Sequence, residues 1–184
     1  MRRAVLLCVV LAVAMPVAAA GYTRAMRSHS GTAPGMAPAA EQADRIIVDK
    51  PARLMRLTRG DKVIRSYAIS LGGAPTGHKI RAGDERTPEG LYRIDWRNAG
   101  SIAHLSMHIS YPEPRDVAAA KARGDDPGGA IMIHGMLNGW GWIGGAHRLV
   151  DWTNGCIAVT NAEMREIWAL VPDGTPIEIR GQDI

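Results

Sequence analysis

IHGMLNGWGWIGGAHRLVDWTNGCIAV, residues 133–159, is the most informative stretch of this 184-residue chain. It opens with a His-Gly pair at His134 and closes with a Thr-Asn-Gly-Cys run that ends at Cys156. Short apolar runs at 130–134 and 157–159 are typical of strands. A thiol needs a base to become a reactive thiolate, and His134 is the candidate base. The stretch therefore predicts strands that present a cysteine nucleophile and its histidine.

The N-terminus has the pattern of an export signal. In residues 1–20, two arginines precede an uncharged run of 17 residues, and Ala18 and Ala20 supply the small-x-small pattern before a cleavage point. An uncleaved anchor is the alternative, because such a run is at the lower limit for crossing a bilayer. Cys8 would leave with the signal and Cys156 would remain unpaired. A single thiol in an oxidising compartment indicates a partner chain or chemistry.

Charge and length point to one domain that does not bind nucleic acid. The chain has 22 basic and 18 acidic residues, and removal of residues 1–20 leaves 20 against 18. The pI of 9.4 is therefore no sign of nucleic-acid binding. Residues 21–43 are rich in Ala, Gly, Pro and Ser, and we expect a flexible tether there. Residues 44–184 are enough for a single domain whose core needs no disulfides.

Short apolar runs separated by turn residues predict a mainly β fold, a β-sandwich or an open barrel. The expected strands cover residues 46–48, 54–57, 63–69, 90–96, 104–109, 130–134, 157–159 and 176–180. Gly60 supplies the turn of a hairpin between the second and third of these strands.

One or two short helices complete the expected fold. Thr160 and Glu163 form a capping box, which predicts a helix that begins there. Apolar residues follow at helical spacing and should form its buried face: Met164, Ile167, Trp168 and Val171. A weaker helix is expected over residues 116–123, where the run of three alanines at 118–120 favours it.

The two elements of the opening stretch resemble the active-site segment of the L,D-transpeptidase family, the YkuD-type catalytic domain. In that family a His-Gly pair is followed, after about 14 to 17 residues, by Ser/Thr-His-Gly-Cys, an apolar residue and an Arg. Here the 17 residues 136–152 separate the pair from Thr153. PTGHK at 75–79 and RTPEG at 86–90 extend the resemblance to roughly residues 45–181.

The sequence departs from the family pattern at two positions. Asn154 stands where most members have His, and Ala158 stands where most have Arg. An Asn side chain donates hydrogen bonds but does not titrate, so the role of base falls to His134 alone. The absence of an Arg at position 158 leaves open which donor and acceptor peptides the enzyme uses. Some branches of the family carry Ala there, so the change does not indicate inactivity.

The resemblance implies four catalytic residues, Cys156, His134, Gly135 and Gly155. His134 would take the thiol proton while the Gly135 carbonyl holds the imidazole. Cys156 would attack the bond between residue 3 and D-Ala 4 of a stem peptide, with backbone N–H groups at Gly155 and Cys156 holding the oxyanion. No cofactor is expected. A zinc site built from histidines is disfavoured, because their spacing lacks a ligand signature.

Six further side chains are expected to contact the substrate. They flank the nucleophile, belong to the Gly-rich loop, or belong to the run HISYP: Thr153, Asn154, Asn138, Trp142, His108 and Tyr111. Two alternatives stay open here. Trp142 and its neighbour Trp140 either wall the cleft or pack in the core. Tyr111 either points its hydroxyl at the substrate or packs on the core.

The sequence thus predicts a peptidoglycan L,D-transpeptidase that forms a thioester on Cys156 and transfers it to an amine. We expect a periplasmic monomer of a Gram-negative envelope, with stem peptides as partners and membrane contact only through residues 1–20. An L,D-carboxypeptidase or an endopeptidase, including one that releases a wall-bound lipoprotein, is the alternative. A non-catalytic wall-binding module is disfavoured, because a binder has no need of the complete set of His134, Gly155 and Cys156.

Overall fold

The computed structural model describes residues 32–181. The expected signal peptide, 1–20, and the first part of the expected tether, 21–31, lie outside the described residues. Within residues 32–181, no helix has the length and hydrophobicity needed to cross a lipid bilayer.

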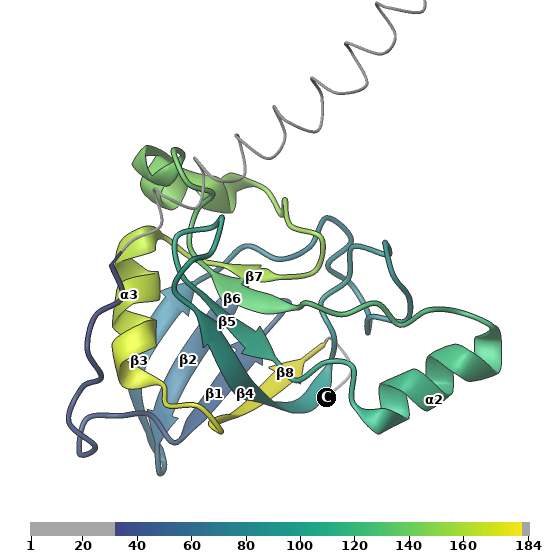
Figure 1. Cartoon of the computed structure of the whole chain (residues 1–184), viewed down its shortest axis with the longest axis horizontal. Helices are drawn as coiled ribbons and strands as arrows, with labels where there is room; N and C mark the ends of the chain where they lie inside the picture. The colour runs from purple at the N-terminus through teal and green to yellow at the C-terminus, as the bar shows by residue number, and fades with distance from the viewer. Residues whose placement is uncertain (1–31, 182–184) are drawn as a thin grey trace, which may run out of the picture.

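Eight strands form one curled sheet with the order β3-β2-β1-β8-β4-β5-β6-β7 (Figure 1). Their bounds are β1 Arg45–Asp49, β2 Leu54–Arg59, β3 Lys62–Ala68, β4 Gly90–Asn98, β5 Ser106–Ile109, β6 Met132–His134, β7 Ile157–Ala158 and β8 Pro176–Arg180. Beyond β3, Ser70 bridges to Ala158 and Gly72 bridges to Thr153. These bridges bring the two edges of the sheet together, and the predicted mainly β, open-barrel fold is confirmed.

The interior of the curled sheet is filled by alternate side chains of its strands. On β1, Ile46 and Val48 are fully buried, and on β2 Met55 and Leu57 are fully buried. This period of two puts one face of each strand into the core. Each such side chain stabilises the fold by about 1.5–3 kcal/mol relative to an exposed one. The core is continuous with the buried residues of β8 and of the last helix.

Two α-helices flank the sheet at different places (Figure 1). α3, Asn161–Leu170, begins at the predicted capping box, in which the Thr160 hydroxyl accepts from the Glu163 N–H. Its predicted face is buried, and it ends just before Pro172. α2, Pro114–Arg123, begins two residues before the expected start, because Pro114 suits the first turn and Glu113 with Asp116 forms a second capping box.

Residues 32–43, part of the expected tether, lie along α3. The Ala37 N–H donates to the Ala169 carbonyl, and the Ala43 N–H donates to the Leu170 carbonyl. Ala43 is 3% exposed and belongs to the core. These hydrogen bonds fix the path of residues 32–43, which composition alone predicts to be flexible.

Three local features differ from the expected strands. The strand expected at 104 begins at Ser106, because His104 has a φ of 64° and cannot extend the ladder. The strand expected at 130 begins at Met132 for the same reason, since Ala130 has a φ of 55°. A 3-10 segment, η1 Gly141–Leu149, was not expected.

Candidate active site

The strand pairing brings His134 and Cys156 to one face of the sheet. β6 and β7 are parallel, with His134 opposite Ala158. Two residues earlier on β6, Met132 lies beside Cys156, and its backbone N–H lies 3.4 Å from the sulfur. Residues two apart on a strand share a face. His134 and Cys156 are therefore diagonal neighbours, with Cα atoms roughly 8 Å apart from strand spacing and rise.

Both side chains line one open cleft of about 560 Å³. Its floor consists of two rows that cross three neighbouring strands, β4, β5 and β6. One row is Asn98, Ser106 and His134. In the other row Trp96 and Met132 line the cleft, and His108, which lies between them, does not. The walls come from neighbouring loops: Gly100, Ser101, Ile102, Ala103, Ala130, Leu137, Trp152, Thr153, Asn154 and Cys156.

The turn that carries Cys156 is fixed by Thr153 and Gly155. The Thr153 hydroxyl accepts from the Gly155 N–H at 3.1 Å and donates to the Cys156 carbonyl at 2.7 Å. Gly155 has a φ of 114°, and a Cβ there would lie 2.5 Å from the Arg86 carbonyl oxygen. Only glycine fits this conformation and this close approach. Because Thr153 takes the Gly155 N–H, that amide is not directed at the cleft, unlike in the expected oxyanion site.

The ring of His134 is held by a backbone carbonyl. Its Nδ1–H donates to the Gly135 carbonyl at 2.6 Å, which leaves Nε2 as the acceptor nitrogen. The side chain is buried, and burial lowers the pKa of the imidazole, while the bond to Gly135 opposes the shift. The Trp152 ring meets the imidazole edge to face at 5.8 Å. A Cβ on Gly135 would lie 2.7 Å from Asn161 Oδ1 and 3.0 Å from His104 Cβ, so a side chain here would displace these neighbours.

Cys156 rests as a thiol. Burial raises the pKa of the thiol, and the Met132 N–H partly offsets the rise. The S–H donates to the Ala130 carbonyl at 3.7 Å. In the described part of the chain, no hydrogen bond joins the sulfur to the His134 ring. Burial thus opposes charge on both groups, and the S–H is directed at the Ala130 carbonyl and not at His134.

The YkuD family, described as an L,D-transpeptidase catalytic domain, matches residues 43–179 of this chain. The chain belongs to this family. No curated protein matches the sequence. The fold is similar to that of the helical cell shape determining protein Pgp2 from Campylobacter jejuni, with a TM-score of 0.59 and 21% identity over 88% of this chain and 56% of that one. It is also similar to Bd1075 from Bdellovibrio bacteriovorus, with a TM-score of 0.52 and 22% identity over 79% of this chain and 50% of that one. The chain therefore spans about half the length of these two relatives.

In this YkuD domain, four of the six expected substrate residues lie at the cleft or support it. Thr153 and Asn154 line it. Asn138 is buried instead, where its Oδ1 accepts from the His104 N–H and its Nδ2 donates to the Ser101 carbonyl. It thus holds the loop that forms the rim. His108 lies in the strand row between Trp96 and Met132 but does not line the cleft, and its ring stacks on the Trp96 ring.

The other two expected residues lie elsewhere. Tyr111 is 2% exposed, and its hydroxyl donates to the Pro127 carbonyl at 3.0 Å. Of the two alternatives for this residue, packing on the core is the observed one. Trp142 is 80% exposed and stacks on Trp140 at 6.4 Å between ring centroids. It lines neither the cleft nor the core, because η1 turns the Gly-rich loop outward.

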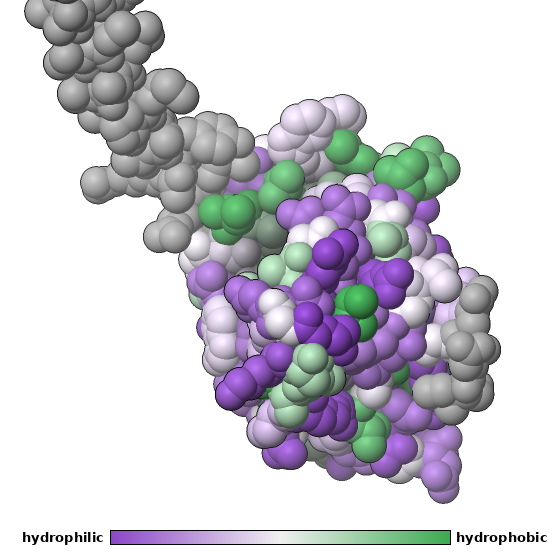
Figure 2. All heavy atoms as spheres, turned by 90° about the vertical axis from the view of Figure 1, so that its right-hand side faces the viewer, coloured by the Kyte–Doolittle hydropathy of each residue, from purple (hydrophilic) through white to green (hydrophobic). Residues whose placement is uncertain are grey.

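Around η1, the YkuD domain exposes an apolar surface made of Leu137, Trp140, Trp142, Leu149 and Val150. Figure 2 shows a largely hydrophilic face whose apolar atoms gather near the upper end, where η1 lies in Figure 1. A hollow of about 370 Å³ beneath this surface shares Leu137 and Trp152 with the catalytic cleft.

Sequence reasoning missed several residues of the cleft, above all Trp96 and Trp152. Trp152 directly precedes the Thr-Asn-Gly-Cys run, and that position was a usable signal. Trp96 lies sixty residues before Cys156, and only the pairing of β4, β5 and β6 brings it to the cleft. No metal centre accompanies the site: within residues 32–181, no three His, Cys, Asp or Glu side chains are arranged to hold an ion.

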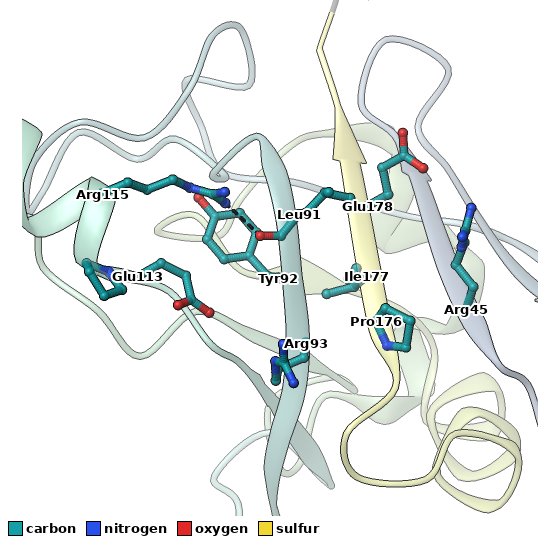
Figure 3. A pocket seen from close by; sticks show the side chains of 10 residues that line it. Arg45, Leu91, Tyr92, Arg93, Glu113, Arg115, Pro176, Ile177 and Glu178 are labelled. Carbon is teal, nitrogen blue, oxygen red and sulfur yellow. Dashed lines mark hydrogen bonds between the residues drawn. The ribbon is translucent and has the colours of Figure 1, made fainter.

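A second groove, of about 730 Å³, lies between β4, β8, β1 and the start of α2 (Figure 3). Arg45, Arg93 and Arg115 line it. The Arg115 Nη2 donates to the Leu91 carbonyl at 2.6 Å, and its guanidinium covers the Tyr92 ring. This groove shares no lining residue with the catalytic cleft, so it is separate from the thiol chemistry.

Proposed function

We propose that this YkuD domain is a cysteine-dependent peptidoglycan L,D-transpeptidase. The observation that carries the proposal is the placement of Cys156 and His134 on one face of β6 and β7, inside one open cleft. A buried structural thiol would have no such access to solvent and no neighbouring base. Membership of the family supports peptidoglycan as the substrate.

The proposed reaction begins when the thiol turns toward His134 and Nε2 accepts its proton. The sulfur attacks the carbonyl carbon of stem residue 3, and the C–N bond to D-Ala 4 breaks. His134 returns the proton to the leaving amine. An amine of a second stem then attacks the thioester carbon, and its proton returns through His134 to the thiolate.

The oxyanion of each step needs donors other than the Gly155 N–H, which Thr153 occupies. We assign this role to the Cys156 N–H, with the side-chain amide of Asn154 at the cleft wall as a second donor. One donor of this kind is worth about 2.7–4 kcal/mol in the transition state.

Hydrolysis of the same thioester is the second candidate, as in an L,D-carboxypeptidase or an endopeptidase. The described residues that line the cleft include no Lys, Arg, Asp or Glu. Ala158, at the usual Arg position, is fully buried and exchanges two backbone hydrogen bonds with Ser70. Because no carboxylate in the cleft can hold the ammonium group of an acceptor stem, water should compete more effectively for the thioester.

We further propose that residues 1–20 are an export signal, that residues 44–184 form the catalytic domain, and that the enzyme acts in the periplasm. The proposal rests on the N-terminal pattern and on the cell-wall substrate of the family.

The test is digestion of defined tetrapeptide muropeptides, followed by mass spectrometry of the products. Wild type should give cross-linked dimers if it is a transpeptidase, and monomeric tripeptides if it is a hydrolase. Cys156→Ala should give neither. Leu91→Ala, which changes an exposed residue outside the cleft, is the matched control and should keep wild-type turnover. Full turnover by Cys156→Ala would refute the proposal.

A further inference from the structure

A β-bulge on β4 places a tryptophan at the end of the catalytic cleft. The register between β4 and β5 shifts between Ile94 and Trp96: Ile94 pairs with Ile109, and Trp96 pairs with His108. Asp95 is the extra residue of β4. Bulges bend a strand and change the direction of its side chains, and they are common beside active sites.

The bulge residue and its neighbours hold the tryptophan in place. Asp95 Oδ1 lies 2.6 Å from His108 Nδ1. The His108 ring stacks on the Trp96 ring, with centroids 4.9 Å apart and planes at 14°. This separation is close to the spacing of neighbouring strands, so the two rings stand side by side with their faces in contact. Trp96 is nevertheless 45% exposed and lines the cleft.

An exposed indole fixed in this way needs an explanation. Large apolar surfaces that are both exposed and held rigid contribute little to stability, whereas rigid aromatic side chains are effective binding anchors. The carboxylate of Asp95 fixes the imidazole, and the imidazole fixes the indole. Trp96 lines the same cleft as Cys156.

The distance between Trp96 and Cys156 determines which part of a stem peptide Trp96 can contact. Trp96, His108, Met132 and Cys156 lie in one row across β4, β5, β6 and the start of β7. Three strand spacings separate the first from the last, roughly 14 Å between Cα atoms. One extended residue spans at most about 3.6 Å. A leaving group of a single amino acid cannot reach Trp96, whereas three donor residues cover about 11 Å and end close to it.

We infer that Trp96 is a specificity residue that binds the sugar-proximal end of the donor stem, its first residue and the lactyl-muramyl unit attached to it. The C–H faces of a lactyl group and of a pyranose ring are apolar and match an indole surface. Asp95 and His108 are positioning residues that act through Trp96. The inference rests on the proposed function, because it takes the scissile bond to lie at Cys156.

Binding to a form of the full chain that cannot turn over gives the test. In Cys156→Ala, we compare the Kd of a disaccharide-tetrapeptide with that of the free tetrapeptide by calorimetry. The disaccharide ligand should bind about fivefold more tightly, the effect of one aromatic contact. Adding Trp96→Ala should abolish the difference, and adding Trp96→Phe should restore part of it. Leu91→Ala is the matched control, since Leu91 is a 64% exposed apolar residue of the same strand that lines the other groove.

The outcomes separate this inference from the proposed chemistry. Equal binding of both ligands with Trp96 intact, or a difference that survives Trp96→Ala, overturns the inference whatever the turnover of wild type. A Trp96-dependent difference in an enzyme that cleaves no muropeptide keeps the contact between Trp96 and the muramyl end of the ligand and refutes the chemistry. If Trp96→Ala does not fold, Trp96→Phe and Asp95→Asn decide: both should reduce the difference, and its full retention in both overturns the inference.

Discussion

The hydroxyl of Thr153 donates to the carbonyl oxygen of Cys156 at 2.7 Å and accepts from the N–H in between, that of Gly155. One side chain thus closes the turn that presents the nucleophile. This turn sets the direction of the Cys156 side chain, because Cys156 is the last residue of the turn and β7 begins at Ile157.

Replacement of the Thr153 hydroxyl should loosen that turn. Thr153→Val keeps the shape but leaves the Gly155 N–H without its acceptor, which costs about 1–3 kcal/mol of the free energy of unfolding. We expect kcat for stem-peptide turnover to fall by about tenfold or more, as misplaced nucleophiles do. Thr153→Ser should restore both stability and kcat. Denaturant titration and steady-state kinetics measure the two effects, and wild-type kcat in Thr153→Val would contradict the role.

Gly155 should tolerate no side chain. In Gly155→Ala, the Cβ would lie 2.5 Å from the Arg86 carbonyl oxygen at a φ of 114°, so the turn must move. We expect a loss of several kcal/mol in unfolding free energy together with loss of activity. Gly174→Ala is the matched control, because its φ is 89° but nothing lies within 4 Å of the new Cβ. It should cost about 1–2 kcal/mol and leave kcat unchanged. Equal losses in the two variants would contradict this account.

The acid limb of the pH–rate profile should report His134. Burial lowers the pKa of this imidazole below its ordinary 6.5, and the bond to the Gly135 carbonyl only partly opposes that shift. The profile of kcat/KM against pH reports the free enzyme, so its acid limb should lie below pH 6.5. An acid limb above pH 6.5 would contradict a lowered pKa of His134 as the group that limits turnover.

Three buried histidines should make the fold sensitive to mild acid. Burial lowers the pKa of His104, His134 and His147 below 6.5. Below pH 6.5 the unfolded chain takes up protons that the folded chain excludes. The unfolding free energy should therefore be fully present above pH 6.5 and fall as the pH drops through the lowered values. Thermal unfolding between pH 7.5 and 5 measures the fall, and His104→Gln with His147→Gln should flatten it. A Tm that stays constant over this range in wild type would contradict the expectation.

Much of the fold could be predicted because its signals are local. The capping box of Thr160 and Glu163 fixes the start of α3 within the sequence itself, and the hairpin at Gly60 joins neighbouring strands. Strand ends were predicted less well. His104 and Ala130 adopt positive φ for reasons that lie in their tertiary surroundings, and no local pattern of residues reveals this.

The candidate site could be predicted only where it coincides with a motif. His134, Gly135, Gly155 and Cys156 belong to one short stretch, and their arrangement follows from the parallel pairing of β6 with β7. Trp96 reaches the cleft through a bulge and two further strand pairings, which spacing in the sequence does not encode.

Intact-protein mass spectrometry can show whether Cys156 carries the acyl group during turnover. After brief incubation with a tetrapeptide stem, wild type should carry an added mass equal to the stem without its D-Ala. Peptide mapping should place this mass on Cys156, and Cys156→Ser should carry no thioester. An adduct on another residue, or the same products from Cys156→Ser without any adduct in wild type, would contradict the account.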